Sequence, residues 1–172
     1  GGAIVESSFA DISTLNPVLS SDSASGTNAG RMFYAMATLD PFSGAVVPQI
    51  ATGWDVSDDG LTYTFHLRDD VMWSDGTQLT ANDVAFTFDA INTDNVASPR
   101  RSNVAEVDSW EAVDDFTLQM NLKSVDCTII GNVGVQGIIP AHVYEGDPEN
   151  IVDSPENTAP TVVNGPFTFV EH

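Results

Sequence analysis

Carboxylates are the most abundant side chains in this sequence that could do chemistry. Asp and Glu account for 25 of the 172 residues, whereas Lys and Arg account for only 5. Oxygen ligands of this kind suit Ca²⁺, and Asp55-x-Ser57-x-Asp59-Gly60 matches the first half of an EF-hand loop. Its twelfth position, where an EF-hand has a bidentate Glu, is His66, and the flanking residues alternate as strands do. The run therefore favours a hairpin turn over a calcium site.

Histidine, a common metal ligand, occurs at His66, His142 and His172. No close ligand spacing joins them, and His66 falls on the outward phase of a predicted strand, so no metal site is expected. The single Cys127 excludes an intrachain disulfide and a Cys-rich zinc motif. The sequence also lacks a nucleophile elbow and a phosphate-binding loop. It therefore indicates neither an enzyme nor a cofactor.

Tryptophans and one basic pair are the remaining candidates for binding a ligand. Trp54, Trp73 and Trp110 could stack on a sugar or a peptide, but each lies in or beside a strand pattern, where core packing is the simpler interpretation. Arg100 and Arg101 form the only pair of adjacent cations. In a chain with a formal charge of −20, we expect them to form local ion pairs rather than to recruit a ligand.

The formal charge of −20 excludes whole classes of partner. An acidic surface repels polyphosphate and anionic lipid, so neither nucleic acid nor an anionic membrane surface is expected to bind. Because 42% of the residues are apolar, we expect a folded core and not an acidic disordered tail. No apolar run approaches the roughly 20 residues of a membrane-spanning helix, and residues 1–4 do not resemble a signal peptide.

The elements that must position these side chains are expected to be short strands in hairpins and a few helices. Alternation of apolar and polar residues over 61–68 predicts a half-buried strand, paired through a turn at 57–60 with a strand over 50–56. Thr80 and Asp83 have the spacing of a capping box, which predicts a helix start. Further expected elements are strands at 3–6, 104–113, 117–122 and 162–170, a helix over 29–37 capped by Ser25 or Thr27, a short helix begun by Pro140, and irregular segments at 7–26, 92–103 and 146–161.

Several ordered motifs resemble the signature of one family. They run from Pro48 to Trp54 (PQIATGW), from Asp59 to Arg68 (DGLTYTFHLR) and from Asp75 to Val84 (DGTQLTANDV), with LNP at 15–17, IIPAHV at 138–143 and NGPF at 164–167. Together they resemble the family 5 extracellular solute-binding proteins, the dipeptide, oligopeptide and nickel receptors of ABC importers. The resemblance covers nearly the whole chain.

The sequence departs from the family pattern at several positions. Ile50 stands where the family usually has Leu, and Asn164 stands where it usually has Thr before Gly-Pro. The segment 27–39 lacks the family's usual Tyr-Glu-x-Leu. Because the Gly-Pro loop lies near the ligand in relatives, the resemblance does not identify the solute.

The resemblance implies a mixed α+β fold, namely part of one lobe of a type II periplasmic-binding-protein-like receptor with an inserted α+β domain rich in β-hairpins. Residues 1–38 would begin the first ligand-binding lobe, residues 39–159 would form the extra domain, and residues 160–172 would return a strand to the lobe. Family members run several hundred residues further, so we expect an N-terminal fragment from which the second lobe is absent.

The function that the resemblance implies is the substrate-binding component of an ABC transporter, capturing peptides or a similar small solute for import. Its partners would be the solute and the permease subunits in the membrane. Its location would be periplasmic or extracellular, with a lipid anchor to the cytoplasmic membrane as one way of tethering it. The alternative is an extracellular β-rich adhesion or carbohydrate-binding module that uses its tryptophans, which would not explain the ordered motifs.

The solute-binding residues are expected in loops at strand ends, because those loops reach a cleft between lobes. Ser25 and Asn28, near a helix N-terminus, could donate hydrogen bonds to a carboxylate. The full set of expected ligand-binding residues is Phe9, Ser23, Ala24, Ser25, Asn28, Asn164 and Gly165.

Overall fold

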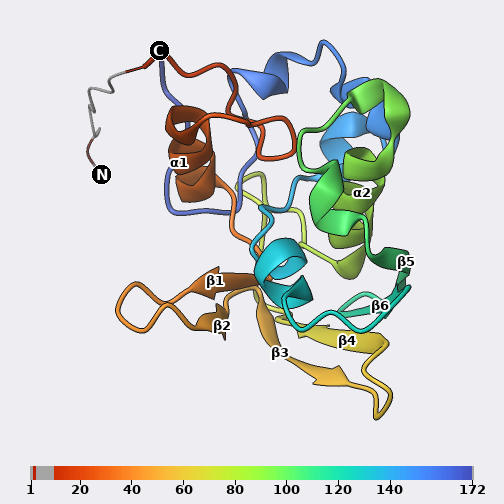
Figure 1. Cartoon of the computed structure of the whole chain (residues 1–172). Helices are drawn as coiled ribbons and strands as arrows, with labels where there is room; N and C mark the ends of the chain where they lie inside the picture. Colours follow the sequence, from red (N-terminus) through yellow and green to blue (C-terminus); the bar gives the residue numbers. More distant parts are fainter. Residues whose placement is uncertain (1, 3–9, 172) are drawn as a thin grey trace.

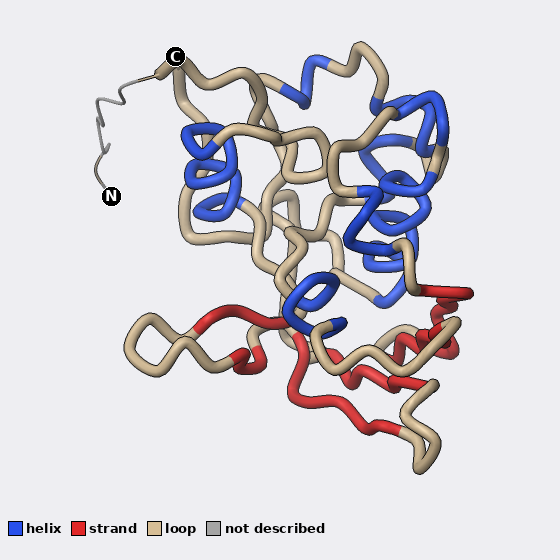
Figure 2. The backbone as a smooth tube through the Cα atoms, in the orientation of Figure 1, coloured by secondary structure: helices blue, strands red, loops and turns tan. Residues whose placement is uncertain are grey.

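The computed structural model of the chain describes residues 2 and 10–171. Within these residues the strands lie at one end of the molecule, and the two α-helices and most of the longer loops lie at the other (Figures 1 and 2). In chain order the main elements are α1 (Ser23–Met32), β1 (Ala37–Leu39), β2 (Val46–Pro48), β3 (Ala51–Val56), β4 (Thr62–Leu67), α2 (Ala81–Asn92), β5 (Val107–Asp114) and β6 (Thr117–Leu122). Short helical turns lie at Asp94–Val96, Arg101–Val104, Ile130–Gly134, Ala141–Tyr144, Pro148–Ile151 and Pro155–Asn157. Neither described helix is long and apolar enough to cross a membrane.

Two antiparallel hairpins form a four-stranded sheet in the order β3-β4-β6-β5. On its buried face Tyr63 lies opposite Met120 and Phe65 lies opposite Leu118. Helix α2 packs against β5 and β6. The strand predicted over 61–68 is therefore confirmed, because its alternate apolar side chains have a packed layer to face.

The Asp-Asp-Gly run between β3 and β4 is a hairpin turn, as the sequence predicts. Gly60 has a φ of +72°, a left-handed conformation that glycine adopts without steric strain. The carboxylate of Asp59 accepts hydrogen bonds from Ser57 Oγ at 2.6 Å and from the Leu61 amide at 3.1 Å. Both bonds are to Oδ1, and they lower the pKa of Asp59 and commit that oxygen to the turn.

The first turn of α2 has the predicted helix-start signature. The Thr80 amide donates to Oδ2 of Asp83 at 2.9 Å, as in a capping box. The same buried carboxylate accepts hydrogen bonds from the Ala141 amide at 2.9 Å and from the Trp73 indole at 3.3 Å. Burial raises the pKa of Asp83 above its usual value. Asp83 therefore also ties α2 to two other segments of the chain.

The predicted helix over 29–37, capped by Ser25 or Thr27, is wrong in its bounds. α1 begins at Ser23, because Asp22 is its N-cap and accepts a hydrogen bond from the Ser25 amide at 2.8 Å. The helix ends at Met32, since the backbone beyond it leaves to pair with β2 and with the C-terminal segment.

The predicted strand over 162–170 is also wrong, since no residue of that range is in a strand. Pro166 has no amide hydrogen to give to a neighbouring strand. The Gly165 amide donates instead to the Met32 carbonyl at 2.7 Å. Three smaller predictions also differ from the structure. The segments 92–103 and 146–161, predicted to be irregular, contain helical turns, and the strand predicted over 104–113 begins later, at Val107. Pro140 is the cap of its helical turn rather than the first residue. The strand predicted at 3–6 lies outside the described residues.

The tryptophans pack into or against the core, as their strand patterns predict. Trp73 is buried, with 2% of its surface exposed. Trp54 and Trp110 are half-buried, and their ring centroids lie 6.1 Å from Phe65 and 5.7 Å from Phe88, respectively. This packing weakens the case for a carbohydrate-binding module, which would need aromatic faces open to a sugar.

Candidate functional site

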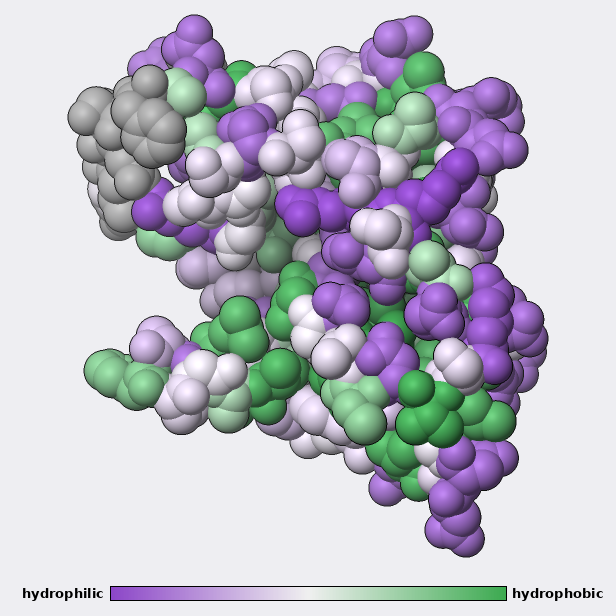
Figure 3. Space-filling model, viewed as in Figure 1, coloured by the Kyte–Doolittle hydropathy of each residue, from purple (hydrophilic) through white to green (hydrophobic). Residues whose placement is uncertain are grey.

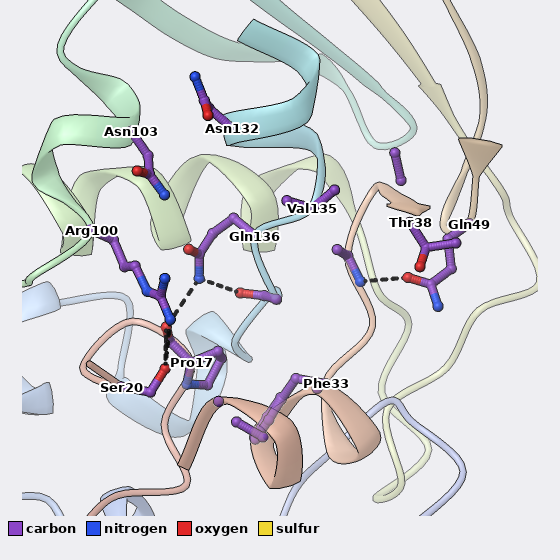
Figure 4. Close-up of a pocket in the computed structure, with 16 residues that line it drawn as sticks. Pro17, Ser20, Phe33, Thr38, Gln49, Arg100, Asn103, Asn132, Val135 and Gln136 are labelled. Atoms are coloured by element: carbon purple, nitrogen blue, oxygen red, sulfur yellow. Dashed lines mark hydrogen bonds between the residues drawn. The ribbon is translucent and has the colours of Figure 1, made fainter. Parts of the chain in front are cut away.

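The surface is hollowed beside α1, above the projecting β1–β2 hairpin (Figure 3). A cavity of about 240 Å³ lies there. α1 and its C-cap contribute Gly26, Ala29, Gly30 and Phe33, whose spacing places them on one face of the helix. The other walls come from the loop before α1, the start of β1 and the helical turns that follow α2 and β6 (Figure 4).

An arginine and a glutamine bring hydrogen-bonding groups to this cavity (Figure 4). Nη2 of Arg100 donates to Ser20 Oγ at 3.1 Å. Nε of Arg100 is buried and has no hydrogen-bond partner in the described part of the chain. Gln136 is buried, and its Nε2 donates to the carbonyls of Pro17 at 3.3 Å and Gly137 at 3.2 Å. These bonds fix both side chains at the cavity wall.

Three further amide side chains line the cavity. Oε1 of Gln49 accepts a hydrogen bond from the Ala35 amide at 3.0 Å. The side chains of Asn103 and Asn132 hydrogen-bond to no described residue. None of the lining residues is Asp or Glu, so Arg100 is the only charged side chain of the wall. A concave wall with a few convergent polar groups is the usual form of a small-molecule site.

A second and larger hollow, of about 520 Å³, lies between the loop before α1 and the C-terminal segment. Its wall includes the apolar side chains of Ile12, Leu15 and Phe169. The hydroxyl of Thr14, which also lines it, donates to the Asn157 carbonyl at 2.8 Å. Because few polar groups of this hollow remain for a ligand, the cavity beside α1 is the better candidate.

The sequence-predicted binding residues lie on α1 and just beyond the far end of that helix, and none of the described ones lines the cavity. Ser25 is fully buried, and its Oγ accepts hydrogen bonds from the amides of Ser13 at 3.0 Å and Thr14 at 3.3 Å. Nδ2 of Asn28 donates to the Ala24 carbonyl at 2.9 Å. Both side chains thus bond within the protein, and the expected contact with a solute carboxylate gains no support from this arrangement.

The remaining described positions lie at the two ends of α1. Ser23 is exposed at the first residue of α1, whereas Ala24 is buried. Asn164 and Gly165 lie at the C-terminal end of the helix, where Oδ1 of Asn164 accepts a hydrogen bond from the backbone after α1 at 2.7 Å. Phe9 lies outside the described residues. Contact between the solute and these positions stays a prediction.

Sequence reasoning missed the residues that line the cavity. It treated Arg100 and Arg101 alike, as members of local ion pairs. That holds for Arg101, whose Nη1 lies 2.8 Å from Oδ1 of Asp94, but Arg100 pairs with no carboxylate in the described part of the chain. Gly26 and Gly30, one helical turn apart, are the one local signal that could have indicated a hollow beside α1.

The two described histidines, His66 and His142, lie outside the cavity wall. Nε2 of His66 lies 2.8 Å from Asp55, and Nε2 of His142 lies 2.8 Å from Asp75. Across residues 2 and 10–171, no three His, Cys, Asp or Glu side chains gather as they would around a metal ion. The third histidine of the sequence, His172, lies outside the described residues.

The profile of the bacterial extracellular solute-binding proteins, family 5 Middle, matches residues 45–172. The oligopeptide-binding protein AppA of Bacillus subtilis is 28% identical over 99% of this chain. Its solved structure, in complex with a nonapeptide, superposes with a TM-score of 0.87 over 96% of the chain, at 25% identity.

Two other solved structures are also similar. The ABC transporter substrate-binding protein CtaP of Listeria monocytogenes is 36% identical, with a TM-score of 0.82 over 94% of this chain and 33% of CtaP. NikZ of Campylobacter jejuni, in complex with Ni(L-His), is 28% identical, with a TM-score of 0.82 over 95% of this chain and 32% of NikZ.

These superpositions confirm the predicted fold class, a mixed α+β part of a type II periplasmic-binding-protein lobe. The chain spans about a third of the length of AppA, 32% of its sequence and 33% of its structure.

Proposed function

The chain belongs to the bacterial extracellular solute-binding proteins of family 5, and we propose that it forms part of the substrate-binding component of an ABC importer. In this role it would hold a small solute outside the cytoplasmic membrane and present it to permease subunits. The observation that carries the proposal is the cavity beside α1, with its convergent amides and arginine. The similarity to AppA over nearly the whole chain supports it.

Peptides are the proposed class of solute. AppA is named an oligopeptide-binding protein, and its solved structure holds a nonapeptide. Amide side chains both donate and accept hydrogen bonds, so the wall formed by Gln49, Asn103, Asn132 and Gln136 suits a peptide backbone.

A second surface is proposed to close over this cavity. Small-molecule sites usually have about 300–1,000 Å³ and bury roughly 70–90% of the ligand surface. The cavity of about 240 Å³ is smaller and open, so this wall alone encloses too little. In the proposed mechanism the solute selects a closed arrangement of two lobes.

The proposed division of the chain follows the family. Residues 1–38 and 160–172 would belong to one ligand-binding lobe, and residues 39–159 to the extra domain. The hydrogen bond from the Gly165 amide to the Met32 carbonyl, at 2.7 Å, supports placing the two terminal segments together.

The proposed location is periplasmic or extracellular. A lipid anchor to the cytoplasmic membrane would keep such a receptor near its permease. Labelling cells with palmitate and fractionating them tests both points: the labelled protein should be recovered with the membrane and exposed to an added protease.

The variant Gly30→Trp tests whether this cavity binds the solute. Gly30 lines the cavity, and a Cβ added there meets no atom within 4 Å, so a side chain can begin at this position without strain, and we expect an indole to occupy the cavity. Titration calorimetry of the whole protein, as its gene encodes it, with a pool of tripeptides to nonapeptides should show at least a tenfold loss of affinity.

Thr27→Trp is the matched control, because Thr27 is exposed on the same helix and does not line the cavity. It should bind peptides as the unmodified protein does. Equal affinities of all three proteins would remove the cavity from the site. Failure of the unmodified protein to bind any peptide in the pool would contradict the proposed solute class.

A further inference from the structure

We propose that Arg100 makes the cavity beside α1 specific for a solute that carries a carboxylate. This inference rests on the proposed function and names the chemical group that the site recognises. Arg100 would pair with that group at the inner wall, while neighbouring amides hydrogen-bond to the adjoining part of the solute (Figure 4).

The guanidinium of Arg100 is held in place but largely unpaired. A guanidinium has five N–H donors. One Nη2 donor is used by Ser20 Oγ at 3.1 Å, and Ser20 itself is buried. Nε is buried without a partner, and Nη1 has none in the described part of the chain. The side chain is therefore oriented while donors remain for a ligand.

Three other cations already have partners within the protein, although Nε of Arg101, like Nε of Arg100, is buried without a partner in the described part of the chain. Arg68 holds Asp70 at 2.8 Å, and Arg101 holds Asp94 at 2.8 Å. Nζ of Lys123 donates to the Ala105 carbonyl at 2.6 Å. With 25 acidic residues available, an arginine that reaches none of them within the described chain is unusual.

The surroundings of Arg100 favour an anion from outside the protein. No Asp or Glu lines the cavity, so no internal carboxylate competes there. A half-buried charge without a partner is unfavourable, and a bound anion removes that penalty. Arginine pairs with the planar carboxylate through two parallel hydrogen bonds, which favours this group over a point-like anion.

Two parts of a peptide could supply the carboxylate, namely its C-terminus and an acidic side chain. Four compounds separate them: Ala-Ala-Ala as the free acid, Ala-Ala-Ala amide, Ala-Glu-Ala amide, and the non-peptide dianion glutarate. Each is titrated into the whole protein by calorimetry.

Three variants are compared with the unmodified protein. Arg100→Gln removes the charge and the fork of donors, Arg100→Lys keeps the charge alone, and Arg68→Gln removes one charge from an exposed position just after β4. Thermal melts of each variant establish that it is folded. Arg68→Gln is the control for the change in net charge.

The expected result is that at least one carboxylate compound binds, and binds at least tenfold more tightly than Ala-Ala-Ala amide. Arg100→Gln should lose that preference, Arg100→Lys should keep part of it, and Arg68→Gln should keep all of it. Preference for the free acid identifies the C-terminus, and preference for Ala-Glu-Ala amide identifies a side chain.

Other outcomes overturn the proposal in distinct ways. If the amide and the acids bind equally, or if Arg100→Gln keeps the preference, the peptide function stands and the role of Arg100 is refuted. If only glutarate binds, and Arg100→Gln abolishes it, the carboxylate site stands and the peptide class is refuted. If no carboxylate compound binds the unmodified protein, the carboxylate site itself is rejected.

Discussion

Gly165 lies against the end of α1 at a distance that only glycine allows. A Cβ at this position would lie 2.5 Å from the Arg31 carbonyl oxygen and 2.7 Å from the Met32 carbonyl carbon. Gly165→Ala should therefore lower the free energy of unfolding by about 1–3 kcal/mol, because backbone atoms must move. Urea denaturation followed by circular dichroism measures this change.

Gly30→Ala is the control for this change, since a Cβ at Gly30 meets nothing within 4 Å. It should raise the free energy of unfolding by roughly 0.5–1 kcal/mol through helix propensity. A Gly165→Ala protein as stable as the unmodified chain would show that the contact with α1 yields easily.

Asp22 makes the stability of α1 depend on pH. Hydrogen bonds from the Ser25 amide and the Ser13 and Ser25 side chains lower the pKa of Asp22 to about 2. Because folding lowers this pKa, the stability that the Asp22 carboxylate contributes is fully present above its unfolded-state pKa near 3.8. This stability is lost as the pH falls towards 2. Asp22→Asn should therefore be less stable than the unmodified chain at pH 6, with the difference shrinking as pH falls.

Urea denaturation of both proteins at several pH values between 2 and 6 checks this expectation. Asp69→Asn is the control, because Asp69 is exposed and lies outside α1. A stability difference that stays constant over this range would contradict the assignment to the Asp22 carboxylate.

At the scale of elements, the sequence predicts what local signals determine. The strand β4 follows from alternation over 61–68, and the start of α2 follows from Thr80 and Asp83, three residues apart. The predicted start of α1 is wrong because Ser25, one of the two expected caps, turns its hydroxyl to the preceding loop, while Asp22, three residues earlier, caps the helix.

The cavity could not be predicted because its walls come from distant segments. The sequence does not distinguish Arg100 from Arg101, yet one faces the cavity and the other pairs with Asp94. Among the motifs that carry the family resemblance, the one over 59–68 belongs to the sheet and its turn, and only Pro17 and Gln49 of all the motif residues line the cavity. The motifs therefore identify the family without identifying most of the residues that line the cavity.

At the scale of the whole molecule, the charge of −20 opposes folding through repulsion between like charges. Added salt screens this repulsion, and only 5 cations offer attractive pairs that salt would weaken. The melting temperature should therefore rise between 0.01 M and 0.5 M NaCl. Differential scanning calorimetry measures it, and sucrose of equal osmolality is the control for excluded-solute effects.

A melting temperature that falls with NaCl would mean that the few ion pairs, such as Arg68 with Asp70, outweigh the repulsion. A rise as large in sucrose would assign the effect to solute exclusion rather than to screening.

The contacts between the segments that flank α1 and the last part of the chain also limit when this region can fold during synthesis. Their hydrogen bonds join Thr14 to Asn157 and Tyr34 to Asn164, residues 143 and 130 positions apart. At 5–20 residues per second, a ribosome needs on the order of 10 s to make the intervening chain. We therefore expect the segments on either side of α1 to make these contacts only after the chain has been synthesised as far as Asn157 and Asn164.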